Sequence, residues 1–372
     1  MNSQANGNFQ KSPNGYKYFL PNMVDVEHCF SPEVYTLCIK ASQKLAELNA
    51  FSNFIPDVDF FIQMHISKEA LDSNKIEGTK TEMEELYIDN SLIPDQNRNE
   101  VEEVKNYIKS LNYGIERMET LPLSTRLLQE CHKILMDGVR GEHKSPGEFR
   151  KSQNWIGGAT IMDAHFVPPS CEHIRDLMSD LEKFLHYNNC PELIKIGIAH
   201  YQFETIHPFL DGNGRVGRLL ITLYLIHTNL LYKTVLYLSE FFEKNKNLYY
   251  QNLDMSRSTA GMENWLKFFL VGITQTAENN LFKLQKIVKL KSDSEAKIME
   301  LGKKSKNAKI ILNYLFKNPV ITVAQTQEIA NLSSVSTVNN LIKGLVKLGI
   351  LYEKTNFKRN RIFVFCDYID IF

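Results

Sequence analysis

The residues of this chain whose types and spacing could carry out chemistry gather in one stretch, residues 206–218, which reads I-H-P-F-L-D-G-N-G-R-V-G-R. His207 has an imidazole that can be neutral near pH 7 and can act as a base. Asp211 offers a hard oxygen ligand of the kind that Mg²⁺ prefers. A base and a metal carboxylate four residues apart are two of the parts that phosphorus-transfer chemistry needs.

The second half of this stretch is suited to binding phosphate. Gly212, Asn213 and Gly214 let the backbone approach a ligand closely and point its N–H groups outward. These N–H groups precede a predicted helix, and a helix N-terminus favours an anion. Arg215 and Arg218 lie three residues apart on one face of that helix, where their guanidinium groups can hold phosphate oxygens.

Two apolar helices are expected to hold this stretch in place. Residues 192–205 and 215–228 are apolar on several faces, so both helices should be buried and the loop between them rigid. His200, on the first of them, is expected to be a satisfied core histidine, and no role is predicted for His132. Further helical patterns cover residues 99–117, 124–136, 171–187, 239–254 and 261–290, and a helix capped by Ser67 runs to Glu77 with Gly78 as its stop.

Residues 147–169 interrupt the helical pattern. Aromatic and β-branched residues surround Gly157-Gly158, which predicts a β-hairpin. A lone hairpin on a helical body leaves a strand edge open, and an open edge can capture an extended peptide. Trp155 fits either the hairpin core or a contact with a target, and the sequence leaves both open.

The stretch 206–218 resembles the signature of the Fic family, H-x-F-x-D/E-G-N-G-R-x-x-R, at every fixed position. The resemblance covers roughly residues 60–275. It implies a protein adenylyltransferase that moves AMP from ATP onto a Tyr, Thr or Ser hydroxyl of a protein, self-modification included. It implies that His207 deprotonates that hydroxyl, that Phe209 fixes the loop in the core, and that Asp211 binds Mg²⁺ beside the phosphates. The implied phosphate-binding residues are Gly212, Asn213, Gly214, Arg215 and Arg218.

The same resemblance implies two further groups of site residues. The predicted hairpin is similar to the family's flap, which positions the target segment and would comprise Ile156, Gly157, Gly158 and Ala159. Tyr249 and Tyr250 lie where family members often contact the nucleotide base, with ordinary helix packing as the alternative.

Ser73, Glu77 and Gly78 carry a second, independent match, because S-N-K-I-E-G resembles the family's inhibitory motif, S/T-x-x-x-E-G/N. Ser73 and Glu77 are four residues apart and share one helix face. The resemblance implies that Glu77 pairs with Arg218, which then no longer holds the γ-phosphate productively. It places the chain in the subgroup with an N-terminal inhibitory helix, here residues 67–78, whose members often form homodimers. A plain helix end capped by Gly78 is the alternative.

Charge is unevenly distributed along a chain whose net charge is zero. Residues 281–361 contain 16 basic and 5 acidic residues, a net charge of +11, which leaves −11 for the rest. This asymmetry predicts a basic C-terminal domain on an acidic body.

The last residues follow the outline of a winged helix-turn-helix domain. Thr322-x-x-Gln325 fits a capping box that opens one short helix, Ser334 can cap the next, and Gly349 can end it before a basic two-stranded ribbon. The second helix would present Ser336, Thr337, Asn339, Asn340 and Lys343 to a DNA groove, and the ribbon would offer Lys358, Arg359 and Arg361 to phosphates. Winged helices also serve as protein contacts, so the partner stays open between DNA and protein.

These patterns together predict a mainly α fold, a Fic-type helical bundle with a β-hairpin flap and a C-terminal winged helix-turn-helix domain. The expected division is an N-terminal helical region with a flexible leader (residues 1–60), a Fic catalytic domain (61–280), a basic helical linker (281–305) and the winged-helix domain (306–372). No long apolar run and no secretory signal are evident, and the six cysteines are scattered, so we expect a cytoplasmic protein with reduced thiols and no membrane contact.

Two other functions are compatible with the same residues. The basic tail would suit a DNA-binding regulator whose Fic unit only senses nucleotide, although binding alone needs no base such as His207. Fic-type transfer of another phosphate-containing group is the second alternative, and the presence of Gly214 and Arg218 favours AMP transfer from ATP over it.

Overall fold

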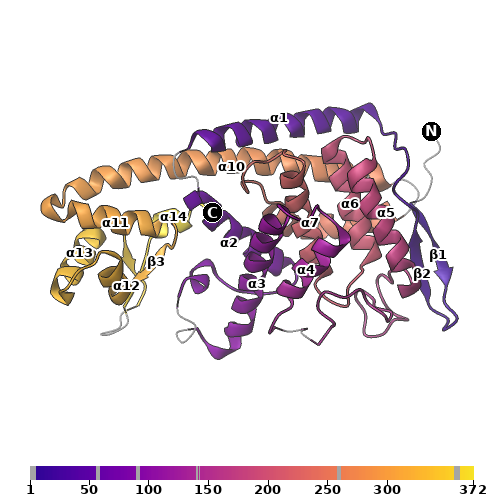
Figure 1. Cartoon of the computed structure of the whole chain (residues 1–372), viewed down its shortest axis with the longest axis horizontal. Coiled ribbons are helices and arrows are strands. Elements are labelled where there is room, and N and C mark those ends of the chain that lie inside the picture. Colours follow the sequence, from indigo (N-terminus) through magenta and orange to yellow (C-terminus); the bar gives the residue numbers. More distant parts are fainter. Residues whose placement is uncertain are drawn as a thin grey trace.

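The computed structural model of the chain describes residues 6–55, 59–88, 93–139, 141, 143–257, 261–355 and 361–372. Helices dominate, as predicted, and Figure 1 shows them gathered into a large body and a smaller C-terminal unit. The body contains α1 (Pro32–Phe54), α2 (Asp59–Ile76), α3 (Asp95–Arg117), α4 (Thr125–Leu135), α5 (Ile174–Tyr187), α6 (Glu192–Ile206), α7 (Asn213–His227), α8 (Ser239–Lys244), α9 (Lys246–Ser256) and α10 (Gly261–Met299), with 3-10 turns at Met83–Leu86 and Cys171–His173.

Helices α6 and α7 form the centre of the body. Residues 193–206 of α6 and 215–225 of α7 are all buried, which confirms the prediction of two apolar helices around the loop. Each fully buried Leu or Ile side chain contributes about 1.5–3 kcal/mol to folding, so these two helices form a stable frame. Trp265 of α10 donates its indole N–H to the carbonyl oxygen of Gly197 at 2.8 Å, which fixes α10 against α6.

Helix α10 joins the body to the C-terminal unit and lies along α1 (Figure 1). Lys267 pairs with Glu33, and Lys44 pairs with Glu278 at 3.7 Å, so ion pairs accompany this contact. The helix continues without a break through residue 299. The predicted boundary between residues 280 and 281 therefore lies inside one helix, because apolar residues that pack on the body continue past it.

The N-terminal region differs from the prediction of a flexible leader followed by helices. Strands β1 (Gly7–Lys11) and β2 (Lys17–Pro21) form an antiparallel hairpin in which Gly7 faces Pro21. Phe19 is fully buried, its N–H donates to the carbonyl oxygen of Val167 at 2.9 Å, and its ring centre lies 6.3 Å from that of Phe166. This hairpin is stabilised by packing on a segment distant in sequence, which its polar composition could not reveal.

The predicted β-hairpin around Gly157-Gly158 is also only partly correct. A single antiparallel bridge joins Ile156 to Phe166, and the residues between them form bends and turns. The carboxylate of Asp163 accepts hydrogen bonds from the N–H groups of Ala159 and Thr160 at 3.0 and 2.7 Å. Because this carboxylate satisfies N–H groups that a strand ladder would use, the flap (residues 156–166) is a short loop closed by one bridge.

Two predicted helix boundaries are wrong. Helix α2 begins at Asp59, and Ser67 lies inside it with its hydroxyl 2.8 Å from that of Tyr87. Ser67 is therefore no N-cap, because the apolar pattern extends upstream of it. The helix predicted for residues 239–254 is divided into α8 and α9 at Asn245.

The C-terminal unit contains α11 (Ser305–Leu315), β3 (Val320–Thr322), α12 (Val323–Ile329), α13 (Val335–Lys347), β4 (Tyr352–Glu353), β5 (Ile362–Val364) and α14 (Cys366–Ile369). The strands form an antiparallel sheet in the order β3-β5-β4. The capping box of Thr322 and Gln325 is confirmed, and Gly349 follows α13 with φ of +71°. Ser334 takes the N-cap position of α13, but its side chain makes no capping hydrogen bond in the described structure. This order is compatible with a winged helix, which stays a prediction, and Lys358 and Arg359 lie outside the described residues.

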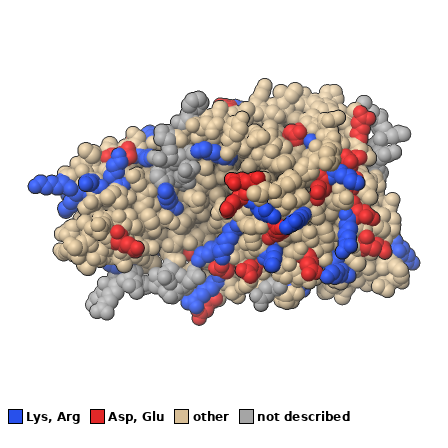
Figure 2. Space-filling view, in the orientation of Figure 1, with Lys and Arg blue, Asp and Glu red and all other residues tan. Residues whose placement is uncertain are grey.

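The C-terminal unit contacts the body at α2. The ring centre of Phe372 lies 5.8 Å from that of Phe61 and 5.9 Å from that of His65, and Lys354 pairs with Glu84 at 3.2 Å. Basic side chains outnumber acidic ones at the end of the molecule where α10 turns into α11 (Figure 2). Across the described ranges, no helix combines the length and apolarity needed to cross a membrane.

Candidate active site

The catalytic loop (residues 207–212) connects α6 to α7 and has a sharply turned backbone. His207 ends α6 in the left-handed region, with φ of 51°, and its N–H donates to the carbonyl oxygen of Phe203 at 2.9 Å. A left-handed conformation costs a residue with a side chain roughly 1–2 kcal/mol, so the surrounding structure must enforce it. Gly212, with φ of 75°, provides the second turn immediately before α7.

Asn213 closes the loop with its side chain. Its amide oxygen accepts from the N–H of Phe209, and its amide nitrogen donates to the carbonyl oxygen of Phe209, both at 2.8 Å. Phe209 is fully buried, as predicted. The side chain of Asn213 therefore shapes the loop, which leaves only its backbone N–H for the predicted contact with phosphate.

The start of α7 presents N–H groups suited to an anion. The N–H of Val216 makes the first hydrogen bond within the helix, to the carbonyl oxygen of Gly212 at 3.1 Å. The preceding N–H groups, at residues 213–215, therefore have no carbonyl partner within α7 and can bind an anion together with the positive end of the helix dipole.

Glu77 lies at this anion site. Its carboxylate accepts from Arg218 Nη2 at 2.6 Å, and it lies so close to Gly214 that any side chain there would collide with it. Burial favours the neutral form of Glu77, but the charge and hydrogen bond of Arg218 together with the charge of Arg215 outweigh this and hold the pKa of Glu77 below its usual value. The predicted ion pair is thus present, and the carboxylate occupies the region where phosphate is expected.

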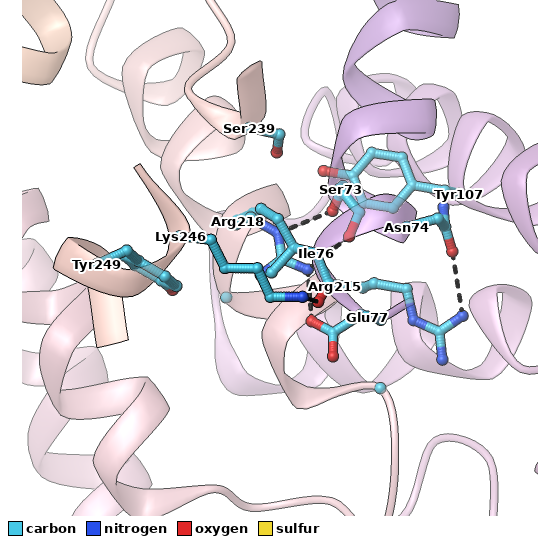
Figure 3. Close-up of polar contacts among 12 residues, drawn as sticks. Ser73, Asn74, Ile76, Glu77, Tyr107, Arg215, Arg218, Ser239, Lys246 and Tyr249 are labelled. Atoms are coloured by element: carbon cyan, nitrogen blue, oxygen red, sulfur yellow. Dashed lines mark hydrogen bonds and ion pairs between the residues drawn. The ribbon is translucent and has the colours of Figure 1, made fainter. Parts of the chain in front are cut away.

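Ser73 completes the grip on Arg218 (Figure 3). The Nε of Arg218 donates to the hydroxyl of Ser73, and Nη2 donates to the carbonyl oxygen of Ser73, both at 2.9 Å. Arg218 is buried. Ser73 in the last turn of α2 and Glu77 directly after the helix therefore hold the same guanidinium group.

Other contacts fix the C-terminal half of α2. The carboxylate of Glu69 accepts from the hydroxyl of Tyr107 at 2.9 Å and from the N–H of Ser239 at 3.1 Å. Lys246 donates to the carbonyl oxygen of Ile76 at 2.5 Å, at the end of the helix (Figure 3). Burial raises the pKa of Glu69 to about 7. Helix α2 is thus attached to α3, α8 and α9 as well as to α7.

Arg215 takes a different set of partners from Arg218. It pairs with Glu103 at 3.1 Å and lies 3.6 Å from Asp211, and its Nη1 donates to the amide oxygen of Asn74 at 3.4 Å. The two arginines are thus held by different side chains, although the charges of both act on the carboxylate of Glu77. The phosphate-binding role of Arg215 stays a prediction.

His207 is half-buried, and its Nδ1 lies 3.3 Å from the carbonyl oxygen of Glu204. Since a carbonyl can only accept, this contact assigns the proton to Nδ1 and leaves Nε2 able to take a proton. Burial lowers the pKa of His207 to about 4. The imidazole is therefore neutral at pH 7, which is the state that a general base needs.

His132, for which the sequence predicted no role, contacts the catalytic loop and helps to hold its backbone in place. Its Nδ1 accepts from the N–H of Gly147 at 2.8 Å, so Nε2 carries the proton and donates to the carbonyl oxygen of Asp211 at 3.0 Å. Its ring stacks on that of Phe209 with centres 3.8 Å apart. Burial lowers its pKa to about 4, which keeps it neutral. No local sequence pattern predicted this role, because the residues that His132 contacts are distant from it in the sequence.

Arg150, also missed by the sequence interpretation, ties the catalytic loop to the base of the flap. It is buried, and its guanidinium group donates to the carbonyl oxygens of His207, Ile206, Pro169 and Ser152 at 2.9, 3.4, 2.5 and 3.3 Å. Burial lowers its pKa to about 10, which leaves it charged at neutral pH. Among the residues that the structure describes, no carboxylate pairs with it, so backbone carbonyls alone receive its hydrogen bonds.

The two tyrosines predicted to contact the nucleotide differ in position. Tyr249 is 1% exposed, and its hydroxyl donates to Nε2 of His200, whose Nδ1 donates to the carbonyl oxygen of Gly217. Tyr249 therefore belongs to the core, the prediction that it contacts the base is wrong for this conformation, and His200 is a satisfied core histidine as predicted. Tyr250 is 39% exposed and remains a candidate.

Asp211, the expected magnesium ligand, is accessible to solvent and lies beside the start of α7. Its side chain is 37% exposed beside the start of α7. Within the described parts of the chain, no group of three or more His, Cys, Asp or Glu side chains could hold a metal by itself. Mg²⁺ commonly binds one or two carboxylates together with substrate phosphates, so a single carboxylate is compatible with Mg²⁺, which stays a prediction.

Comparison with family descriptions agrees with this geometry. Residues 35–116 match the description "Fic/DOC family N-terminal", and residues 122–225 match "Fic/DOC family". The chain belongs to the Fic/DOC family. The second match contains the whole catalytic loop of this Fic protein and the flap, and the first contains α2 with Ser73 and the following Glu77.

Individual relatives of this Fic protein support the same conclusion. Proteins named protein adenylyltransferase Fic from Drosophila erecta and Drosophila virilis are 30% and 31% identical to it over 115 residues, which is 29% of this chain and 21% of each relative. The chain thus matches about a fifth of the length of these relatives.

Solved structures show the fold of this Fic protein. A Fic family protein from Desulfovibrio desulfuricans G20 is 20% identical, with a TM-score of 0.57, over 91% of this chain and 97% of that chain. Fic-1 from C. elegans is 18% identical, with a TM-score of 0.50, over 70% of this chain and 75% of that chain.

Proposed function

We propose that this protein transfers AMP from ATP onto a hydroxyl side chain of a protein, and that Glu77 inhibits this reaction. The observation that carries the proposal is the position of Glu77, whose carboxylate lies on Gly214 and pairs with Arg218 at the start of α7. A carboxylate held at a helix N-terminus marks a site built for anions, and a neutral His207 lies in the loop before it.

The reaction would use groups that the catalytic loop already orients. Nε2 of His207 would take the proton of the target hydroxyl while its oxygen attacks the α-phosphorus of ATP. The bond from the α-phosphorus to the bridging oxygen then breaks, and pyrophosphate leaves with the electron pair. The N–H groups at the start of α7 and the guanidinium group of Arg218 would stabilise the phosphates. Asp211 would hold Mg²⁺, which supplies positive charge at the phosphates when bound.

Inhibition follows from competition for one guanidinium group. Arg218 makes an ion pair with Glu77 and two hydrogen bonds with Ser73, so it has little capacity left for a phosphate. The Glu77 carboxylate would also repel phosphate oxygens near Gly214. Displacement or removal of Glu77 should free both the guanidinium group and the start of α7.

The flap is the proposed binding site of the target segment. Residues 156–159 lead away from the only described bridge of the flap, and Trp155 next to them is 42% exposed. Backbone groups at this edge can pair with an extended segment of a target and bring its hydroxyl toward His207. The acceptor residue type, self-modification, homodimer formation and a cytoplasmic location stay predictions.

Labelling with two forms of radioactive ATP tests the reaction type. The Glu77→Gly variant is incubated with Mg²⁺, a cell extract as a source of targets, and ATP labelled at either the α- or the γ-phosphate. AMP transfer predicts protein labelling from α-labelled ATP alone. Labelling from γ-labelled ATP alone would show phosphate transfer and contradict the proposal, as would no labelling from either form.

A further inference from the structure

We propose that the C-terminal unit binds duplex DNA through the exposed face of α13 and the adjoining lysine turn (residues 302–309). Helices α12 and α13 are joined by a short turn at residues 330–334, in which Asn331 has φ of 49°. One face of α13 is buried, through Val338, Leu341, Ile342 and Leu345. The opposite face is exposed and therefore free to enter a groove.

The exposed face of α13 has the composition expected of a DNA-reading surface. Its exposed residues include Ser336, Thr337, Asn340, Lys343 and Lys347. No acidic residue occurs between Ile329 and Tyr352. Hydroxyl and amide groups can bond to base edges, and lysines can contact phosphates. Asn339 is less suited than predicted, because it is half-buried and its amide donates to the carbonyl oxygen of Val335 at 3.0 Å.

The lysine turn extends this surface. Its exposed lysines are Lys303, Lys304, Lys306 and Lys309. The turn lies beside α13, because a Cβ atom on Gly344 would be only 3.0 Å from the side chain of Leu301. Lys309 lies 3.6 Å from Glu295, whereas no ion pair engages the other three within the described ranges. Figure 2 shows basic side chains gathered at this end of the molecule.

The uneven distribution of charge along the chain favours one orientation on DNA. Residues 281–361 carry a net charge of +11, and the remainder carries −11. Helix α10 separates the lysine turn from most of the acidic body (Figure 1). A polyanion should therefore be attracted to the C-terminal unit and repelled by the body.

Groove geometry favours duplex DNA over duplex RNA. The major groove of B-form DNA admits an α-helix, whereas that of A-form RNA is too deep and narrow for side chains to read. The thirteen-residue helix α13 has an exposed polar face and is therefore the kind of element that the major groove of DNA admits.

Fluorescence anisotropy of the full chain with a labelled mixed-sequence DNA duplex tests this proposal. The duplex has about thirty base pairs, and NaCl is raised from about 25 to about 200 mM, over which affinity should fall steeply because counterions are released. The double variant Lys343→Glu/Lys347→Glu should weaken binding by about tenfold or more, because it removes two phosphate contacts. The dependence of affinity on salt should become less steep for the same reason. Lys11→Glu/Lys17→Glu, with the same charge change on the exposed β1–β2 hairpin, is the control and should bind like the wild type.

Three outcomes would overturn the proposal. These are no binding at the lowest salt concentration, equal weakening by the α13 and control variants, and competition by duplex RNA as effective as that by duplex DNA. Circular dichroism of each variant checks that the fold is retained. The test needs no AMP transfer, so its result is independent of the proposed catalytic function.

Discussion

The catalytic loop and the flap are linked by Asn154, which lies just before the flap and donates to the carbonyl oxygen of Phe209 at 2.9 Å, and the two segments are built in different ways. The loop connects the buried helices α6 and α7, and its backbone accepts or donates hydrogen bonds with the side chains of His132, Arg150, Asn154 and Asn213. The flap is closed by one bridge between Ile156 and Phe166 and has its internal N–H groups satisfied by its own Asp163. The loop is fixed by side chains from outside it. The tip of the flap is held by its own Asp163, and the last residues of the flap contact other segments, where His165 meets Asp254 and Phe166 meets Phe19.

Exposure of the two segments differs in the same way. Phe209 of the loop is fully buried, whereas Met162 of the flap is 70% exposed. Groups that react must be held in one geometry before substrate arrives, because misplacement by about 1 Å can cost about a hundredfold in rate. A segment that pairs with a target needs open backbone groups instead. For the proposed reaction, the contrast predicts that the catalytic groups are preorganised, while binding of the target segment is completed by the target itself.

The largest effect is expected from the loss of His207, the proposed general base. His207→Ala in the Glu77→Gly background should reduce labelling from α-labelled ATP by about a hundredfold or more, because the proton of the hydroxyl loses its acceptor. ATP binding, measured by calorimetry, should be retained. Labelling within about twofold of the parent would show that His207 is not the base.

Arg150 links the two regions, and its removal should affect both. Arg150→Met leaves several buried carbonyl oxygens without donors, each costing about 1–3 kcal/mol, so the midpoint of thermal unfolding should fall by several degrees. In the Glu77→Gly background kcat should fall along with it, and Arg150→Lys should recover part of both. An unchanged kcat in a folded Arg150→Met variant would contradict a positioning role.

His132 should act on the metal side of the loop. His132→Ala removes the donor to the carbonyl oxygen of Asp211, and loss of such a supporting contact typically weakens metal binding by about 10–100-fold. The concentration of Mg²⁺ that gives half-maximal labelling should therefore rise in the Glu77→Gly/His132→Ala variant. If only kcat falls and the Mg²⁺ dependence is unchanged, His132 does not act through Asp211.

A change in the flap should give a smaller and more selective effect. Asp163→Asn weakens the acceptor for the N–H groups of Ala159 and Thr160, so the flap should lose order while the loop keeps its geometry. We expect KM for the protein target to rise by less than about tenfold, with KM for ATP unchanged. An equal rise in both would show that the flap also shapes the nucleotide site.

The smallest effect is expected from pH. Burial lowers the pKa of His207 to about 4, so its base form is lost only as pH falls through about 4 and is fully present above the usual histidine value of about 6.5. Labelling by Glu77→Gly should therefore show no inflection between about pH 6 and pH 8 that depends on His207. A rate that halves near pH 6.5 would place the imidazole in a more solvated setting.

The sequence predicted the parts of the site that are local. His207, Asp211 and Arg218 lie within one stretch, so their chemistry is visible in their spacing, and Glu77 was found because residues 73–78 resemble the family's inhibitory motif. His132 and Arg150 were missed because their contacts join segments far apart in the chain. Tyr249 was misassigned because the same aromatic pattern suits a ligand contact and a core position.

The fold, too, was predicted correctly where local patterns determine it and incorrectly where contacts between distant segments do. The buried pair α6 and α7 was predicted from continuous apolar patterns. The β1–β2 hairpin was missed because Phe19 is stabilised by Phe166 and Val167, which only the folded chain brings to it. The flap was overestimated as a hairpin, because Asp163 replaces a strand ladder with hydrogen bonds of its own.

The most direct test of the central claim compares labelling from α-labelled ATP by the wild type, Glu77→Gly and Glu77→Gln, with Glu77→Gly/His207→Ala as the inactive control. If Glu77 blocks the start of α7 and holds Arg218, Glu77→Gly should label strongly, the wild type weakly, and Glu77→Gln between them, because the amide keeps the bulk but loses the charge. Equal labelling by the wild type and Glu77→Gly would contradict inhibition by Glu77, and labelling that survives in the His207→Ala control would contradict the assignment of the base.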